Sequence, residues 1–221
     1  MIANLREAEL QAAALFEAIQ QRGMIVAGKS EKQLNKEIYQ LAKSEFGVRT
    51  HWHKRIVRAG ANTLQPYREN PPDLILQEDD IVFFDFGPVF EAWEADFGRT
   101  YVIGNNPKKL KLMRDVESAW HLGKAFYQKQ PHLPAHELFQ YACQLAHQFG
   151  WEFGGPIAGH IIGKFPHEQL QPRNFGNYIH PSNKKSMAEL DTNGHAKNWI
   201  LEIHFVDREA RIGGFFEQLL T

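Results

Sequence analysis

The chain has 221 residues, with 25 basic and 26 acidic side chains, 11 histidines and one cysteine. Its hydrophobic fraction of 43% and charged fraction of 23% exclude intrinsic disorder as the main state. A net charge of -1 gives no electrostatic reason to expect nucleic acid or an acidic membrane surface as a partner. The single cysteine, Cys143, excludes an internal disulfide framework and a thiolate metal cluster. We therefore expect a reducing, cytoplasmic setting and, for any bound metal, histidine and carboxylate ligands.

The first part of the chain predicts two helices. Apolar residues at helical spacing predict a helix over 3–22. A second helix is predicted to open at Ser30, which has the residue pattern of a capping box, and to stop at Gly47. A short extended stretch over 55–59 and a loop rich in Pro and Asn over 60–72 follow.

The remainder of the chain mixes predicted strands and helices. Aromatic and β-branched residues predict strands over 80–104. One helix is predicted to begin at Asn106-Pro107 and to run to about Gln130, and another to follow Pro134. Further extended stretches are predicted at 154–164, 199–206 and 213–220.

Both halves of the chain are predicted to consist of two helices followed by β structure. We therefore expect one α+β domain over 1–221, with halves of about 1–106 and 107–221, a central antiparallel sheet and helices on one face. A polar connection over 168–198 is long for a compact domain, which favours a functional role.

The strongest local signal is a pair of aspartates inside apolar segments. Asp85 follows four apolar residues, and Asp96 lies further along the next segment. If the segments form a hairpin that turns at Phe90-Glu91, Asp85 lies opposite Asp96, roughly 5 Å away on the same face. Two such charges repel each other on an apolar sheet unless a cation lies between them. Taken alone, this pair allows two interpretations. The aspartates form a metal site, or one of them is a turn or edge residue exposed to solvent.

Three more apolar segments each carry one acidic or imidazole side chain: His160, Glu202 and Glu217. Taken alone, a lone His in apolar surroundings is more often a core residue, and either Glu alone is more often a half-exposed strand residue. Together with the two aspartates they form an oxygen-rich set. Such a set suits two divalent ions, with manganese as the first choice and cobalt, iron or zinc as alternatives.

The order of these residues resembles the pita-bread metallopeptidases, the family of methionine aminopeptidase, aminopeptidase P and prolidase. Asp85-Phe86-Gly87 is similar to the D-x-G motif of that family, and Asp96-Phe97-Gly98-Arg99-Thr100 to its D-x-x-R-T motif. Gly159-His160-Ile161-Ile162-Gly163, followed by His167, resembles a third motif. The resemblance runs roughly from Arg55 to the C-terminus, nearer the aminopeptidase P and prolidase branch. It implies a curved antiparallel sheet, helices on its outer face and two halves with pseudo-two-fold symmetry.

The resemblance also implies a role for each candidate residue. Asp85 would chelate one metal ion, His160 and Glu202 the other, and Asp96 and Glu217 would bridge the two. The implied catalytic residues are His167, which would hydrogen-bond the substrate or its tetrahedral intermediate, and Glu202, which would also move a proton.

Three departures from the family pattern concern substrate handling. Pro66 and Pro156 stand where aminopeptidase P relatives have histidines, and Glu202-Ile203-His204 stands in place of Glu-Pro-Gly. The histidines that could compensate are His51, His53 and His204.

We therefore expect a dinuclear metal-dependent aminopeptidase or dipeptidase that hydrolyses an N-terminal peptide bond, with Xaa-Pro as a candidate bond, by means of a metal-bridging hydroxide. Two alternatives stay open. One is a catalytically altered domain that binds a peptide or protein, and the other is a hydrolase or lyase of a small metabolite. The expected partner is a peptide substrate, without nucleic acid or membrane, and a homodimer stays open.

Overall fold

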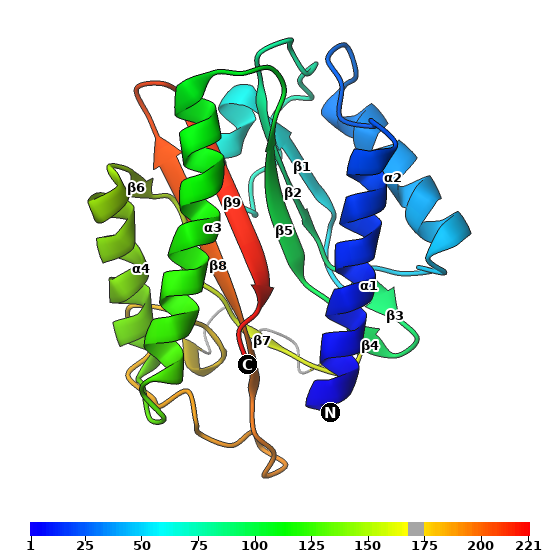
Figure 1. Ribbon diagram of the computed structural model, residues 1–221. Helices are drawn as coiled ribbons and strands as arrows, with labels where there is room; N and C mark the ends of the chain where they lie inside the picture. Colours follow the sequence, from blue (N-terminus) through cyan, green and yellow to red (C-terminus); the bar gives the residue numbers. More distant parts are fainter. Residues whose placement is uncertain (168–174) are drawn as a thin grey trace.

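The structure is a computed structural model that describes residues 1–167 and 175–221. These residues form a seven-stranded antiparallel sheet (Figure 1) in the order β1-β2-β5-β9-β8-β6, and β7 pairs with β8. Its strands are β1 (Ile56–Ala59), β2 (Ile81–Phe86), β5 (Phe97–Val102), β6 (Glu152–Phe153), β7 (Ile161–Ile162), β8 (Asn198–Asp207) and β9 (Ile212–Leu219). A small separate hairpin consists of β3 (Val89–Phe90) and β4 (Trp93–Glu94).

The α-helices of the described chain lie close to their predicted positions. They are α1 (Ile2–Gln21), α2 (Glu31–Glu45), α3 (Pro107–Gln128) and α4 (Ala135–Phe149), with 3-10 turns at Gly60–Leu64 and Phe175–Asn177. The Ser30 hydroxyl accepts a hydrogen bond from the Gln33 N–H (3.1 Å) at the start of α2. Asn106 caps α3 in the same way by accepting from the Lys108 N–H at 3.1 Å. These side chains satisfy backbone donors that have no partner within the helix.

The helices cover one face of the sheet because the strands alternate in polarity. In β2, Val82, Phe84 and Phe86 belong to the hydrophobic core under α1 and α2. In β8, Leu201, Ile203 and Phe205 belong to the core under α3 and α4. Figure 1 shows α1 and α3 lying across this face. Since side chains alternate along a strand, the residues between these core positions point to the other face.

The two predicted halves meet between β5 and β9 at the centre of the sheet. The half over about 1–106 contributes β1, β2 and β5, and the half over about 107–221 contributes β9, β8 and β6. Each half begins with two helices that pack on its own strands. The antiparallel sheet and the position of the helices were predicted correctly.

The predicted register of the aspartate hairpin is wrong by two residues. Asp85 pairs with Gly98 rather than with Asp96, which lies just before β5. The chain turns at Glu91-Ala92, one residue later than expected, because Glu91 adopts a left-handed conformation with a φ of 55°. Asp96 nevertheless reaches the same cavity as Asp85.

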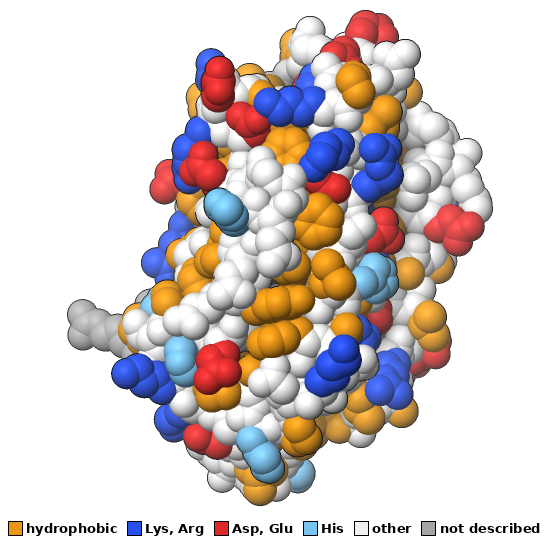
Figure 2. Space-filling view, turned by 60° about the vertical axis from the view of Figure 1, so that its left-hand side comes forward, with side chains coloured by type: hydrophobic (Ala, Val, Ile, Leu, Met, Phe, Trp, Pro, Cys, Tyr) orange, Lys and Arg blue, Asp and Glu red, His pale blue; other side chains and the backbone are white. Residues whose placement is uncertain are grey.

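The outer surface over α3 and α4 is mixed in character. Figure 2 shows this side of the molecule, where hydrophobic side chains form an interrupted strip flanked by charged ones. Between the two helices, Phe126 and Tyr141 stack with their ring centroids 4.1 Å apart. Within the described ranges, no helix combines the length and the apolar character needed to cross a membrane. Of the predicted polar connection over 168–198, residues 168–174 lie outside the described residues.

Candidate metal centre

A cavity of about 780 Å³ lies on the sheet face opposite the helices. The residues predicted as metal ligands all line this cavity: Asp85, Asp96, His160, Glu202 and Glu217. Glu217 is 2% exposed and Asp96 3% exposed, so these carboxylates are almost completely withdrawn from bulk water. The fold therefore brings together all the ligands predicted from the sequence.

Four neighbouring strands place a row of residues across the sheet. Asp85 of β2 pairs with Gly98 of β5, and Gly98 pairs with Glu217 of β9. Glu217 in turn pairs with Glu202 of β8. Cross-strand partners point to the same face, so the row presents three carboxylates, with a glycine between Asp85 and Glu217. A Cβ at Gly98 would lie 2.5 Å from the Phe215 ring, which shows how closely β9 packs there.

Arg99 and Thr100 fasten β5 to β9 beside this row. The Arg99 guanidinium donates to the Glu217 carbonyl at 2.9 Å and lies between the rings of Phe97 and Phe216, 3.7 Å from each centroid. The Thr100 hydroxyl donates to a β9 carbonyl at 2.8 Å and accepts from the N–H of the same residue at 2.6 Å. The R-T motif thus fixes the backbone that carries Glu217.

His160 enters the site from a segment that pairs with β8. The Ile200 N–H donates to the His160 carbonyl at 2.8 Å, and the Glu202 N–H donates to the Ala158 carbonyl at 3.1 Å. Only glycine suits position 159, where φ is +133° and a Cβ would lie 2.0 Å from the Ile200 carbonyl oxygen. Gly159 therefore allows the close backbone approach that brings His160 toward Glu202.

The protonation states of the acids reflect their crowding. Burial raises the pKa of Asp85 to about 7 and that of Glu202 to about 8. Burial, followed by the neighbouring Asp96 and Asp85 charges, raises the pKa of Glu217 well above its usual value. Burial would also raise the pKa of Asp96, but the charge of His53 and a hydrogen bond from His160 hold it below its usual value. Without a cation, this cluster therefore retains protons near neutral pH.

The donor set fits divalent metal ions. Two groups of potential ligand atoms share Asp96, one with His53 and Asp85, the other with His160 and Glu217. Among the described residues, Glu202 Oε1 and Glu217 Oε2 are buried without a hydrogen-bond partner. Buried carboxylate oxygens of this kind are costly unless a cation or proton satisfies them. Carboxylate and imidazole ligands together suit manganese, cobalt, iron or zinc.

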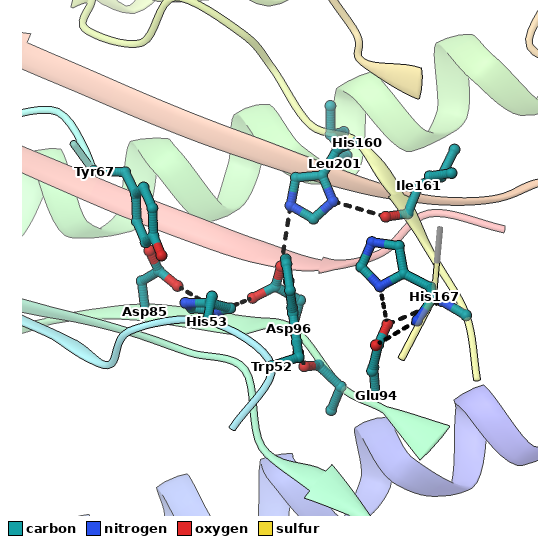
Figure 3. Close-up of polar contacts among 12 residues, drawn as sticks. Trp52, His53, Tyr67, Asp85, Glu94, Asp96, His160, Ile161, His167 and Leu201 are labelled. Atoms are coloured by element: carbon teal, nitrogen blue, oxygen red, sulfur yellow. Dashed lines mark hydrogen bonds and ion pairs between the residues drawn. The ribbon is translucent and has the colours of Figure 1, made fainter. Parts of the chain in front are cut away.

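His53 is the member of the cluster that the sequence left undecided. Its Nε2 lies 3.0 Å from Asp96 Oδ1 and 3.4 Å from Asp85 Oδ1 (Figure 3). His51 and His204, the other two histidines that could compensate for Pro66 and Pro156, do not contact the aspartates in this way. His204 lines the cavity, but its Nε2 is hydrogen-bonded to the Thr63 carbonyl at 2.8 Å, and burial lowers its pKa to about 4. Burial lowers the pKa of His51 to about 3, and the charged groups that act on it are Arg55 and His53 rather than the acids.

His167 is held by a residue that sequence reasoning missed. Its Nδ1 lies 2.5 Å from Glu94 Oε2, and the other Glu94 oxygen accepts from the His167 N–H at 3.2 Å (Figure 3). Glu94 is 1% exposed. The signal in the sequence was an acidic residue two positions before Asp96 in an apolar segment. Within the described chain, His167 Nε2 is buried and has no hydrogen-bond partner, so it is the ring atom left for a ligand.

Pro66 and Pro156 both line the cavity. They therefore occupy the wall on which the resemblance implied two histidines, the one at the Pro66 position facing the substrate. Aromatic and aliphatic side chains complete an apolar part of this wall, namely Ile56, Phe83, Ile157 and Phe215. The predicted departures thus alter the surroundings of the acidic cluster and leave the cluster itself complete.

Comparison with known proteins identifies relatives. The sequence pattern of Metallopeptidase family M24 matches residues 3–193. An Xaa-Pro dipeptidase from Lactobacillus helveticus is 28% identical over 145 residues, which is 65% of this chain and 39% of that protein. The match therefore spans about two fifths of the length of that curated relative.

Solved structures share the fold. The X-Pro aminopeptidase from Thermotoga maritima MSB8 superposes with a TM-score of 0.78 at 21% identity, covering 100% of this chain and 60% of that one. A methionine aminopeptidase from Rickettsia prowazekii gives a TM-score of 0.73 at 15% identity, covering 99% and 91% of the two chains. The predicted pita-bread fold is confirmed.

Proposed function

The chain belongs to metallopeptidase family M24, and we propose that it is a dinuclear metal-dependent hydrolase of N-terminal peptide bonds, with Xaa-Pro peptides as its substrate class. The observation that carries this proposal is the cluster of Asp85, Asp96, His160, Glu202 and Glu217 in one cavity, of which all but the half-buried Glu202 are buried. The similarity to an Xaa-Pro dipeptidase supports the substrate class.

Two divalent ions, when bound to this cluster, would supply Lewis acidity toward the scissile carbonyl and lower the pKa of a water molecule to about 7. Asp96 and Glu217 would hold both ions, Asp85 one of them, and His160 with Glu202 the other. Manganese is our first choice, since four of these five ligands are carboxylates.

Glu202 is suited to accept and release a proton during hydrolysis. It lies in the cavity, and its Oε1 is buried without a hydrogen-bond partner among the described residues. In the metal-free protein, burial raises its pKa to about 8, so the carboxyl group can hold a proton near neutral pH. We assign it the transfer of a proton from the attacking water to the leaving nitrogen.

His167 is suited to stabilise negative charge on the substrate carbonyl oxygen. Glu94 holds Nδ1 and thereby fixes the plane of the ring, and Nε2 has no hydrogen-bond partner among the described residues. When both ring nitrogens carry a proton, Nε2 donates to the developing oxyanion, an interaction typically worth about 3 kcal/mol in acyl transfer.

The cavity wall is compatible with a proline side chain. Its apolar part includes Ile56, Phe83 and Phe215, which pack together on the site face of the sheet. Aliphatic rings bind to such surfaces because apolar area leaves water. A free amino group on the preceding residue would approach the acidic end of the cavity, which accounts for an N-terminal preference.

A substrate panel tests this proposal. Metal-depleted protein is supplied with manganese and assayed on an Xaa-Pro dipeptide, a longer peptide with N-terminal Xaa-Pro, the same peptides with acetylated N-termini, and a peptide with N-terminal Met. We expect hydrolysis of the free Xaa-Pro substrates only. Absence of hydrolysis across the panel, with metal bound, would refute the peptidase assignment.

The replacement of two family histidines by Pro66 and Pro156 favours one alternative function, a peptide-binding domain without peptidase activity. These prolines cannot donate or accept hydrogen bonds through a side chain. Under that alternative, an Xaa-Pro peptide would bind to the manganese-loaded protein and remain intact.

A further inference from the structure

His53 and His160 contact the same carboxylate in closely similar ways. His53 Nε2 lies 3.0 Å from Asp96 Oδ1, and His160 Nε2 lies 3.2 Å from Asp96 Oδ2. Both imidazoles are buried, with their side chains 8% and 9% exposed. Each oxygen of Asp96 therefore has an imidazole beside it, one from each half of the chain (Figure 3).

The backbone fixes the same ring nitrogen in both histidines. His53 Nδ1 lies 2.7 Å from the Lys54 carbonyl oxygen, and His160 Nδ1 lies 2.8 Å from the Ile161 carbonyl oxygen. A carbonyl only accepts, so Nδ1 must carry the hydrogen in each ring. This leaves Nε2 directed at the carboxylates. A backbone carbonyl on one imidazole nitrogen is the arrangement that orients histidines whose other nitrogen binds a metal.

The distances around His53 match those between neighbouring ligands of one ion. With metal–ligand bonds of about 2.1 Å, adjacent ligand atoms lie roughly 3.0 Å apart at right angles and roughly 3.4 Å apart at tetrahedral angles. The His53 Nε2 separations from Asp96 Oδ1 and Asp85 Oδ1 are 3.0 Å and 3.4 Å. A metal ion bound between Nε2 and the two carboxylates would take the place of the proton that they otherwise share.

The segment that carries His53 is anchored beside the end of β2. The Trp52 N–H donates to the Gly87 carbonyl at 2.9 Å, and the Val89 N–H donates to the Thr50 carbonyl at 3.1 Å. The Trp52 indole N–H is held by a further backbone carbonyl at 3.0 Å. His53 is thus positioned by the fold before any ion binds.

Gly87 makes room for this arrangement. A Cβ at this position would lie 2.2 Å from His53 Cδ2 and 2.4 Å from Trp52 Nε1. Any other residue would push the imidazole away from Asp85. The glycine two residues after Asp85 therefore serves to seat His53 as well as to continue the chain.

We propose that His53 is a protein ligand of the metal position that Asp85 and Asp96 form, so that each of the two positions has one imidazole ligand. This inference rests on the proposed dinuclear centre. With His53 as a ligand, the position formed by Asp85 and Asp96 has one nitrogen ligand in addition to its carboxylates. Its affinity for borderline ions such as cobalt and zinc therefore increases relative to its affinity for manganese.

NMR of the full chain tests the proposal directly. Metal-depleted protein with isotopically labelled imidazole nitrogens is loaded with spin-active cadmium, and scalar coupling between cadmium and nitrogen identifies each coordinated histidine. We expect coupling at the Nε2 atoms of two histidines. In His53→Gln one coupling disappears, and cadmium affinity at one position falls by roughly 100-fold, at the upper end of the effect of removing an outer-shell partner.

His51→Gln is the matched control, because His51 lies on the same segment, pairs with Pro88 and is influenced by Arg55 and His53 rather than by the acids. It should keep both couplings. Coupling at His160 alone in the wild-type protein would overturn the proposal and show His53 to be an ion-pair partner of the acids, while leaving the metal centre intact. Failure of the wild-type protein to bind cadmium would instead overturn the dinuclear centre itself. Because the decisive readout uses wild-type protein, poor folding of a variant does not affect the result.

Discussion

Glu202 lies directly opposite Glu217 in the β8–β9 ladder. Two carboxylates in this relation destabilise a sheet, and burial increases the cost. One oxygen of each is buried without a hydrogen-bond partner in the part of the chain that the structure describes. The pair therefore lowers the free energy of unfolding of the metal-free protein, and a cation bound between the two carboxylates would raise it again.

Glu217→Gln should weaken metal binding without lowering the stability of the metal-free fold. The amide keeps the shape of the carboxyl group but removes an anionic ligand, so we expect kcat/KM to fall by at least about 100-fold and one ion to be lost. Burial and neighbouring acids raise the pKa of Glu217 well above its usual value, so a neutral side chain suits the metal-free fold. Thermal unfolding of the metal-free variant at pH 8 should occur at the wild-type temperature or above it. Full activity in this variant would contradict the bridging role.

The metal-free protein should lose stability as the pH rises. In the folded state the pKa of Asp85 is raised from 3.8 to about 7, and that of Glu202 from 4.5 to about 8, both first through burial. Despite burial, Asp96 and Asp85 raise the pKa of His53 from 6.5 to about 9. Between the unfolded and folded pKa values the folded state binds more protons, so the free energy of unfolding falls with increasing pH.

Thermal melts in the presence of a chelator, from about pH 5 to about pH 9, measure this effect. Each kcal/mol lost should lower Tm by about 2–4 °C for a chain of this size. Saturating manganese should remove most of the dependence, because bound ions replace the protons. A Tm of the metal-free protein that rises with pH across this range would contradict the raised pKa values of these groups.

His167→Gln should lower kcat by about 100-fold to 1000-fold through loss of an oxyanion donor. Glu94→Gln should lower kcat by a smaller factor, roughly tenfold, because the ring remains but its orientation is less well fixed. Both variants should bind the same number of manganese ions as the wild-type protein, which titration calorimetry measures. Wild-type kcat in Glu94→Gln would show that the 2.5 Å contact with His167 has no part in catalysis.

Gly159→Ala should destabilise the fold strongly, by about 3 kcal/mol or more, because strain and overpacking add. The new Cβ would lie 2.0 Å from the Ile200 carbonyl oxygen. Gly150→Ala is the control, since Gly150 also has a positive φ, of +84°, but has open space around its Cβ position. Gly150→Ala should lower the free energy of unfolding by about 1 kcal/mol, from backbone strain alone. Urea unfolding measures the free energy of unfolding of both variants. Equal destabilisation by the two substitutions would show that the contact of residue 159 with β8 is not tight.

Local signals in the sequence predicted the helices well. Ser30 and Asn106 cap helices through their own side chains, and such contacts depend only on residues a few positions away. The candidate ligands were singled out because charged residues inside apolar strands are rare without a function. The alternation along β2, β8 and β9 then places Asp85, Glu202 and Glu217 on one face.

Features that depend on tertiary packing were not predicted. The Asp85–Gly98 pairing depends on the left-handed Glu91, and no residue type at that turn specifies this conformation. His53 reaches the acids only because its segment pairs with the chain after β2. Glu94 meets His167 across two distant segments, so neither position alone revealed the contact.

Titration calorimetry of metal-depleted protein with manganese measures how many ions the acidic cluster binds. We expect two ions per chain in the wild-type protein, with proton release on binding because Asp85, Glu202 and Glu217 hold protons in the metal-free state. Wild-type protein that binds no manganese, or one ion without proton release, would contradict a dinuclear centre built from these residues.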